Sequence, residues 1–238
     1  MANGVKTNAI LVVDDDPDIV EIISLYLGNA GYCVSAAADG AEAIRQLECT
    51  DIDLILLDIM LPDQSGTELC LHIRKTCSCP ILFVSCLDEE EQVLRALTVG
   101  GDDYIRKPFY PKELVARVRA MLRRVELERR TVNTAAAELS TGDFVVNMEK
   151  KIIYKHQQEL PLSPIEFDIL LYMLKHPCKP ISCEELYQQV WQSESLGDIR
   201  TVMVHVSNLR KKLEKNDTRK YIKTMKKRGY VFLDQRYN

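Results

Sequence analysis

The stretch LILLDIMLPD, residues 54–63, places four consecutive apolar residues directly before the carboxylate of Asp58. A short apolar run of this kind is typical of a strand buried on both faces of a parallel sheet. The residue after the run emerges at the carboxyl edge of the sheet, where open α/β folds bind their ligands. Asp58 is therefore a metal ligand, a nucleophile or a helix cap, and the flanking sequence has to distinguish these roles.

Segments with strand and helix periodicity alternate on both sides of this stretch. Apolar runs predict further strands at residues 10–13, 33–37, 81–84 and 104–105. Helical spacing predicts helices over residues 17–31, 40–49, 65–75 and 89–98, and one that opens at Pro111. Five strand–helix units in succession predict an α/β fold with a five-stranded, doubly wound parallel sheet.

The charge of the chain is divided between its two halves. Residues 1–125 carry a net charge of −8, whereas residues 139–238 carry a net charge of +5. Such an asymmetry indicates two domains with different partners. The stretch 126–138 is polar and has no core pattern, so we expect domains at 1–125 and 139–238 joined by a linker at 126–138.

Export and membrane signals are missing from this sequence. No segment approaches the roughly 20 apolar residues that span a bilayer, and the N-terminus lacks a basic-then-apolar signal. We therefore expect a cytoplasmic protein with no membrane partner. Its eight cysteines form no Cys-x-x-Cys pair, so they are expected to be reduced core or surface residues. Cys77 and Cys79 are close enough in sequence to leave a redox role open.

Polar residues converge on the edge of the sheet that holds Asp58. Asp14 and Asp15 follow the first strand, Ser85 the fourth and Lys107 the fifth. Three carboxylates that meet repel one another and need a cation, and Mg²⁺ prefers such oxygen ligands. The lysine and the hydroxyl suit a phosphoryl group, so the set predicts a phosphoryl-transfer site.

These residues, with Gly66 and the stretch GGDDY at 100–104, resemble the response-regulator receiver domain over residues 8–125, which has a flavodoxin/CheY-like fold. The resemblance implies that Asp58 is the phosphoacceptor nucleophile. It also implies that Ser85 and Lys107 bind the phosphoryl oxygens and that Tyr104 is a switch aromatic. The Lys107–Pro108 peptide bond is expected to be cis. Mg²⁺ would be held by Asp15 and Asp58, with Asp14 acting mainly through water and the backbone carbonyl of Met60 completing the protein ligands.

Two residues depart from the commonest receiver pattern. Ser85 stands where most relatives carry threonine, and Cys86 stands where they carry alanine. A bulkier neighbour alters the access of water to an acyl phosphate, so we expect slow to moderate autodephosphorylation.

Charged residues around the last predicted helix of this domain have complementary signs. Their pattern is similar to the dimer face of the OmpR/PhoB subfamily, and a two-fold interface needs such self-complementary charge. The expected interface residues are Arg95, Asp102, Asp103, Glu113, Arg117 and Arg119. Arg95 is expected to pair with Glu113, and Asp102 or Asp103 with Arg117 or Arg119, across the dimer.

The second half predicts an α+β domain. Strands are expected at 144–146, 152–154 and 160–162, and a capping box at Ser163–Glu166 opens a helix. Further helices are expected at 182–191 and 199–215, followed by a hairpin whose strands, 221–225 and 229–232, flank Lys226, Lys227 and Arg228. Residues 199–230 carry a net charge of +9, which favours a phosphate-backbone contact over an ordinary solvated face.

The stretches LSPIEF at 162–167, RTVMVHV at 200–206 and RGY at 228–230 resemble the OmpR/PhoB winged-helix effector domain over residues 139–235. The resemblance implies that the third helix enters the major groove and that the hairpin reaches the minor groove or phosphates. The implied DNA contacts are Arg200, Thr201, His205, Asn208, Arg210, Lys211, Lys212, Lys226, Lys227 and Arg228. Many relatives carry arginine where this chain has Ser207 and Asn208; Asn208 suits adenine, which favours an A·T-rich operator.

The sequence thus resembles a two-component response regulator of the OmpR/PhoB family, most like VanR-type regulators. The resemblance implies a sensor histidine kinase as phosphodonor, a homodimer on phosphorylation, double-stranded promoter DNA and RNA polymerase as partners, and no enzymatic turnover of a released product. Two alternatives stay open. A haloacid-dehalogenase-type enzyme also uses an aspartate nucleophile with Mg²⁺, although it normally shows Asp-x-Asp, and a phosphorylation-independent regulator would use its receiver only to dimerise.

Overall fold

The computed structural model describes residues 7–87, 90–131, 138–191, 199–215 and 217–233. The chain divides into two compact units, Met1–Leu122 and Arg123–Asn238, and each is described by itself. In the described part of the chain, no helix combines the length and the apolar character that crossing a bilayer requires.

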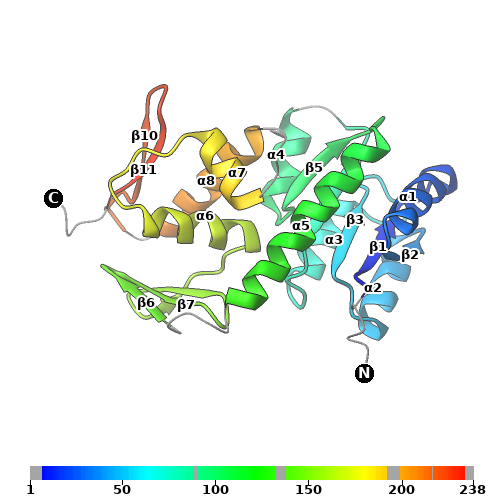
Figure 1. Ribbon diagram of the computed structural model, residues 1–238, viewed down its shortest axis with the longest axis horizontal. Coiled ribbons are helices and arrows are strands. Elements are labelled where there is room, and N and C mark those ends of the chain that lie inside the picture. The colour runs from blue at the N-terminus through cyan, green and yellow to red at the C-terminus, as the bar shows by residue number, and fades with distance from the viewer. Residues whose placement is uncertain (1–6, 88–89, 132–137, 192–198, 216, 234–238) are drawn as a thin grey trace. The chain divides into compact units, whose positions relative to one another are not determined.

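The first unit is built on a five-stranded parallel sheet with strand order β2-β1-β3-β4-β5 (Figure 1). This confirms the predicted doubly wound fold. The elements are β1 (Ala9–Val13), α1 (Pro17–Asn29), β2 (Cys33–Ala37), α2 (Gly40–Cys49), β3 (Leu54–Leu57), α3 (Gly66–Ile73), β4 (Ile81–Ser85), α4 (Glu90–Thr98), β5 (Asp103–Arg106) and α5 (Pro111–Thr131).

The alternation of side chains along the strands divides the core of this unit between two faces. Ile10, Val12, Leu54 and Leu56 pack with apolar residues of α1 and α5 on one face. The intervening residues Leu11, Val13, Ile55 and Leu57 are buried as well, because α2, α3 and α4 cover the opposite face. All residues of β3 are apolar, so the carboxylate of Asp58, which directly follows β3, lies at the edge of the sheet.

The α1 helix begins as its sequence predicts. The Asp16 carboxylate accepts hydrogen bonds from the backbone N–H groups of Asp18 and Ile19, and Pro17 occupies the first turn. Asp16 is thus a helix cap, and it leaves Asp14 and Asp15 as the carboxylates available at the end of β1.

The α5 helix runs further than expected, through Thr131, into the stretch 126–138 that the sequence analysis assigns to a linker. Residues 125–131 contain neither glycine nor proline, so nothing in the sequence breaks the helix at the edge of the first core. The part of the predicted linker at 132–137 lies outside the described residues.

The second unit combines an antiparallel sheet, three helices and a hairpin. Its elements are β6 (Glu138–Thr141), β7 (Phe144–Asn147), β8 (Ile152–Lys155), β9 (Gln158–Glu159), α6 (Pro164–Lys175), α7 (Cys183–Trp191), α8 (Arg200–Leu213), β10 (Ile222–Met225) and β11 (Gly229–Phe232). Strands β6 to β9 pair in sequence order, and β10 pairs with β11. One apolar core joins residues of β7, β8, all three helices and the hairpin.

The start of α6 confirms the predicted capping box. The Ser163 hydroxyl accepts a hydrogen bond from the Glu166 N–H, and the Glu166 carboxylate accepts one from the Ser163 N–H. The strand predicted at 160–162 is wrong, because pairing ends at Glu159. Pro161 has no N–H to contribute to a ladder.

Gly66 at the start of α3 is packed against the backbone of the stretch that holds Asp58. A Cβ at Gly66 would lie 1.9 Å from the Asp58 carbonyl oxygen, which leaves no room for a side chain. The helix N-terminus therefore approaches the loop as closely as it does only because residue 66 is glycine.

We predict that Gly66→Ala lowers the free energy of unfolding by about 1–3 kcal/mol, since the backbone must shift to admit the methyl group. Gly28→Ala in α1 is the matched control, because a Cβ there meets nothing within 4 Å; it should stabilise the protein by about 0.5–1 kcal/mol. Urea unfolding of both variants measures the difference. Equal stability for the two variants would contradict the close approach.

Candidate functional site

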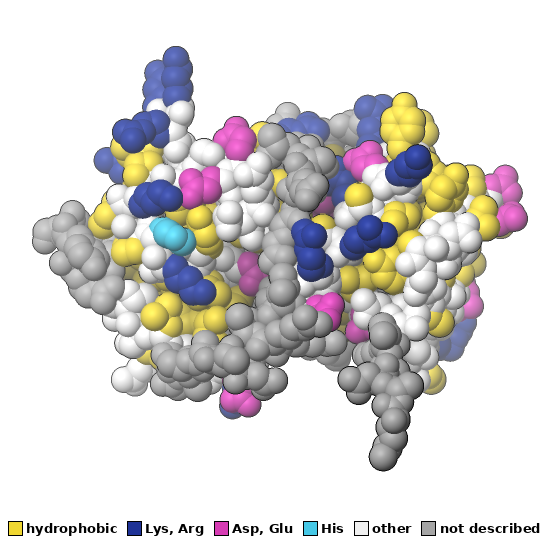
Figure 2. Space-filling view, viewed as in Figure 1, with side chains coloured by type: hydrophobic (Ala, Val, Ile, Leu, Met, Phe, Trp, Pro, Cys, Tyr) yellow, Lys and Arg dark blue, Asp and Glu magenta, His cyan; other side chains and the backbone are white. Residues whose placement is uncertain are grey.

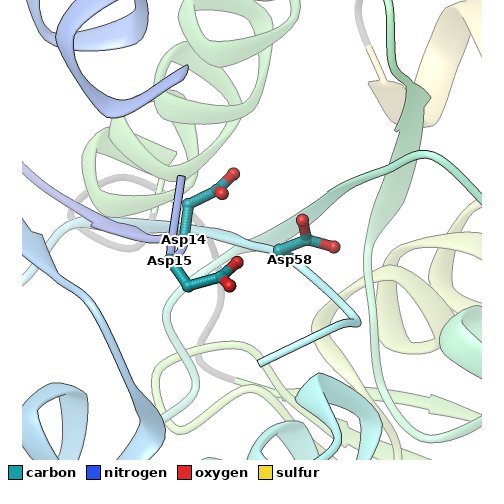
Figure 3. Close-up of side chains that lie close together, drawn as sticks. All are labelled: Asp14, Asp15 and Asp58. Carbon is teal, nitrogen blue, oxygen red and sulfur yellow. The ribbon is translucent and has the colours of Figure 1, made fainter. Parts of the chain in front are cut away.

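The register of the parallel sheet brings the acidic residues together. Val13 of β1 lies opposite Leu57 of β3, so Asp14, Asp15 and Asp58 leave neighbouring strands at the same edge (Figure 3). One carboxylate oxygen from each of the three residues lies within 4.8 Å of the others. Asp14 and Asp58 are buried, whereas Asp15 is exposed. The sequence-predicted acidic cluster is therefore present in the fold.

Lys107 lies between two of these carboxylates. Its Nζ donates hydrogen bonds of 2.6 Å to Asp14 Oδ2 and to Asp58 Oδ2. Burial lowers the pKa of Lys107, but the hydrogen bonds to the two carboxylates outweigh this effect and raise it above the ordinary value. The pKa of Asp14 is raised, because burial outweighs its hydrogen bond from Lys107. The ammonium group thus partly neutralises a cluster of carboxylates that would otherwise repel one another.

The peptide bond after Lys107 is cis, as expected for Lys107–Pro108. The Lys107 N–H donates to the Ser85 carbonyl oxygen, so the two residues are joined through their backbones at the ends of β5 and β4.

Ser85 supplies a hydroxyl without a partner. Its side chain is fully buried, and among the described residues its Oγ makes no hydrogen bond. A buried hydroxyl with no partner costs free energy, which a ligand oxygen bound at this position would recover.

Tyr104 lies close to Ser85 in the neighbouring strand. The ring is buried, and its hydroxyl donates a hydrogen bond to the backbone carbonyl of Leu87, two residues after Ser85. The predicted switch aromatic is therefore joined to the segment that carries the predicted phosphoryl-binding hydroxyl.

The donor set fits a magnesium ion and a phosphoryl group. All three acidic residues present oxygen ligands, the type that Mg²⁺ prefers. The unpartnered Ser85 hydroxyl and the Lys107 ammonium group are the donors that phosphoryl oxygens require. Met60, whose carbonyl is the fourth predicted metal ligand, directly follows this edge, and its N–H donates to Asp58 Oδ1 at 3.1 Å.

The predicted dimer residues lie in two different environments. Arg95, Glu113 and Arg119 are exposed. Asp103 is buried and pairs with Arg117 of the same chain at 2.8 Å, and Arg117 also bonds Glu113 at 2.9 Å.

The structure contradicts the dimer-interface role predicted for Asp102. Its side chain has no exposed surface, and its Oδ2 accepts hydrogen bonds from Arg74 Nη2 at 2.7 Å and from the Ile81 N–H at 2.8 Å. Such a group is not available to a partner across a surface. The role of Arg74 could not be predicted, because an isolated arginine near a helix end does not indicate an ion pair with a buried carboxylate.

Basic residues gather on the β10–β11 hairpin of the second unit, where Figure 2 shows dark blue side chains at the tip. Lys226, Lys227 and Arg228 are all exposed, as are Arg200 and Lys211 of α8. These five residues keep the solvent access that a DNA contact requires.

Other predicted DNA contacts are engaged within the fold. Arg210 donates to the Ile222 carbonyl at 3.1 Å and to Thr224 Oγ1 at 2.7 Å, and its guanidinium stacks on Tyr230 at 5.3 Å. Lys212 pairs with buried Glu166 at 2.6 Å. Arg210 therefore joins α8 to the hairpin.

Three further members of the predicted DNA-contact set are buried: Thr201, His205 and Asn208. This differs from the solvent-facing positions that the prediction requires. The His205 ring lies 5.8 Å from that of Trp191, centroid to centroid, so the imidazole contributes to packing between α7 and α8.

Comparison with known proteins accounts for both units. The family described as "Response regulator receiver domain" matches residues 10–119, and the family "Transcriptional regulatory protein, C terminal" matches residues 157–232. The regulatory protein VanRc of Enterococcus gallinarum is 37% identical, over 93% of this chain and 97% of its own length. The chain is a response regulator of the OmpR/PhoB family.

Other OmpR/PhoB relatives are similar over their whole length. The alkaline phosphatase synthesis transcriptional regulatory protein PhoP of Bacillus subtilis is 39% identical, over 96% of this chain and 98% of its own. The solved structure of DrrB, an OmpR/PhoB homologue from Thermotoga maritima, is 30% identical with a TM-score of 0.50, over 95% of this chain and 99% of that one. PhoP and VanRc match about equally well, so similarity does not single out the VanR type within the OmpR/PhoB family.

The ammonium group of Lys107 in this OmpR/PhoB regulator occupies the carboxylates that would bind a metal ion, so the two cations would compete. We predict that Lys107→Met tightens Mg²⁺ binding roughly tenfold, which corresponds to removing about 1.4 kcal/mol of charge repulsion. Titration calorimetry of the full chain with MgCl₂ measures the affinity. Lys112→Met is the matched control, because Lys112 is exposed and lies outside the cluster; its affinity should equal that of the wild type. Weaker Mg²⁺ binding by Lys107→Met would contradict this arrangement.

Proposed function

We propose that this response regulator accepts a phosphoryl group on Asp58 from a sensor histidine kinase and, as a dimer, binds promoter DNA to regulate transcription. The observation that carries the proposal is the Lys107 ammonium group held between Asp14 and Asp58, beside the unpartnered Ser85 hydroxyl. A structural role for the cluster would leave no reason to bury a hydroxyl without a partner.

The transfer needs little covalent chemistry from the protein. A carboxylate oxygen of Asp58 forms a bond to phosphorus while the bond to the donor histidine nitrogen breaks. Lys107, already within 2.6 Å of Asp58, binds the oxygens of the incoming group, and Ser85 donates its free hydroxyl to one of them. Asp14, Asp15, Asp58 and the Met60 carbonyl would hold Mg²⁺, which supplies the positive charge that neutralises the phosphoryl oxygens.

The switch follows from the contact of Tyr104. When Ser85 moves toward a phosphoryl oxygen, the segment that contains the Leu87 carbonyl moves with it, so the hydrogen bond from the Tyr104 hydroxyl must break or follow. We propose that the ring, which is already buried, then changes its position and that the face formed by α4, β5 and α5 changes in consequence. Arg95, Glu113 and Arg119 are the exposed charges that this face offers to a second copy.

The second unit supplies the DNA contact. We propose a receiver domain at 1–125 and an effector domain at 139–238, with the 126–138 linker beginning as the last turns of α5. The exposed cations of α8 and the hairpin bind phosphates, and RNA polymerase is the partner through which a promoter-bound dimer acts. Binding to promoter DNA places the protein in the cytoplasm. Dimerisation aligns two such units on half-sites of one operator.

We predict that incubation with MgCl₂ and a small-molecule acyl phosphate adds one phosphoryl group to the wild-type chain and none to Asp58→Asn. Intact-protein mass spectrometry measures the addition, and Asp51→Asn, which alters an exposed carboxylate away from the cluster, should be modified like the wild type. Phosphorylation should shift the chain to a dimer in light scattering. Phosphorylation of Asp58→Asn, or catalytic hydrolysis of phosphomonoesters by the wild type, would contradict the proposal.

The hairpin should account for part of the salt dependence of DNA binding. We predict that Lys226→Ala with Arg228→Ala lowers the slope of log Kd against log salt concentration by about 2, because each phosphate contact contributes about 0.9. Lys150→Ala with Lys175→Ala is the matched control, since both lysines are exposed and lie outside α8 and the hairpin. Fluorescence anisotropy with duplex DNA over a salt series gives the slopes. Identical slopes for the two double variants would exclude the hairpin from the contact.

A further inference from the structure

Two cysteine side chains meet in the connection between α3 and β4. The backbone N–H of Cys79 donates to Cys77 Sγ at 3.3 Å. Both side chains are half-buried, so solvent reaches them. The Cys77 sulfur thus lies against the backbone of the residue that carries the second thiol, before any reaction takes place.

The segment is fixed by Arg74, whose side chain is half-buried. Arg74 Nη1 donates to the carbonyl oxygens of Cys77, at 3.3 Å, and Cys79, at 2.6 Å. The same guanidinium is anchored by Asp102 at 2.7 Å and by the Gly100 carbonyl at 2.9 Å. The backbone that carries both thiols is therefore preorganised by an ion pair whose carboxylate is fully buried.

The hydrogen bonds make the two thiols unequal. The hydrogen bond from the Cys79 thiol, the Cys79 N–H and the charge of Arg74 together lower the pKa of Cys77 to about 6, against the effect of burial. The pKa of Cys79 is raised, because the interaction with the Cys77 sulfur and partial burial both disfavour its thiolate. Cys70 differs from both, since burial raises its pKa to about 12. The N–H of Cys79 and the charge of Arg74 thus favour the thiolate form of Cys77, which makes Cys77 the nucleophile of the pair.

We infer that Cys77 and Cys79 form a redox site in which a hydroperoxide converts the two thiols into a disulfide. The Cys77 thiolate attacks the peroxide, so that an S–O bond forms as the O–O bond breaks, and the departing hydroxide or alkoxide takes a proton from solvent to leave as water or an alcohol. The Cys79 sulfur then attacks the sulfur of the Cys77 sulfenic acid. An S–S bond forms, and the hydroxyl group leaves with the Cys79 proton as a second water. Two electrons pass from the thiols to the peroxide.

Oxidation at this site would act on the same unit as Asp58 but through a different part of it. The carbonyl groups that a disulfide must reposition are the two that Arg74 holds. Arg74 in turn contacts Gly100 and Asp102, which directly precede β5. The site is independent of the proposed phosphorylation, because no carboxylate of the acidic cluster takes part in these contacts.

The test uses the full chain with Cys86→Ser, since Cys86 shares the tryptic peptide 76–95 with the pair. The protein is treated with one equivalent of hydrogen peroxide, alkylated, digested and analysed by mass spectrometry. The expected peptide is lighter by two hydrogen atoms and carries no alkyl group, and dithiothreitol restores two alkylation sites. A peptide that keeps both alkylation sites while exposed Cys33 is oxidised would overturn the inference.

Matched variants of Cys79 separate activation from disulfide formation. Cys79→Ser retains a hydroxyl donor, so Cys77 should still react rapidly with peroxide, and the peptide should gain oxygen instead of losing hydrogen. Cys79→Ala removes the donor, and Cys77 should react about tenfold more slowly as its thiolate fraction falls. Equal rates in the two variants would overturn the assigned role of Cys79. Asp58→Asn should form the disulfide like the parent chain, and a failure to do so would contradict the independence of the two sites.

Discussion

The ammonium group of Lys107, held between Asp14 and Asp58, is the interaction on which the first unit depends. Two strands of the sheet, β1 and β3, end in carboxylates that would repel one another and lie buried and unpaired without it. The cation is attached to the chain and cannot leave, yet a phosphoryl group can attract it to new oxygens. The same contact therefore stabilises the resting site and contributes to its reactivity.

The burial of the groups around Lys107 accounts for how the site would respond to the proposed phosphoryl group. Asp58 and Asp14 are buried with a partner, Asp15 is open to solvent, and Ser85 is buried without one. In the proposed switch, a ligand that accepts a hydrogen bond from Ser85 would stabilise a new position of the end of β4. Tyr104 links the segment after β4 to β5 through the Leu87 carbonyl. Local charge is thereby converted into a change of packing.

Much of this arrangement could be predicted from the sequence, because it rests on local patterns. Apolar runs fixed the strands, Asp16 with Pro17 marked a helix start, and the order of strands brought the acidic residues to one edge. Local patterns do not predict the ion pairs. Lys107 and Asp14 are 93 positions apart, and only the folded register shows that they touch. Asp102 looked like a surface charge because its partner, Arg74, lies on another element.

Helix α8 of the second unit shows the same limit of sequence-based prediction. The apolar residues Val202, Val206 and Leu209 recur at helical spacing along α8 and face the core. The family resemblance implies that His205 and Asn208 contact DNA, but both are buried. Residue type predicts exposure only on average, and a buried imidazole beside Trp191 has no signature in a single sequence.

The bonds from Arg210 to the hairpin have a consequence for how the effector domain reads DNA. A guanidinium that binds the Ile222 carbonyl and Thr224 and stacks on Tyr230 makes α8 and the hairpin one rigid body. The distance between α8 and the β10–β11 hairpin is then constant. In the proposed DNA complex, an operator half-site would have to present its groove and its flanking phosphates at that spacing, so insertions of single base pairs within a half-site would be tolerated less well than changes of base.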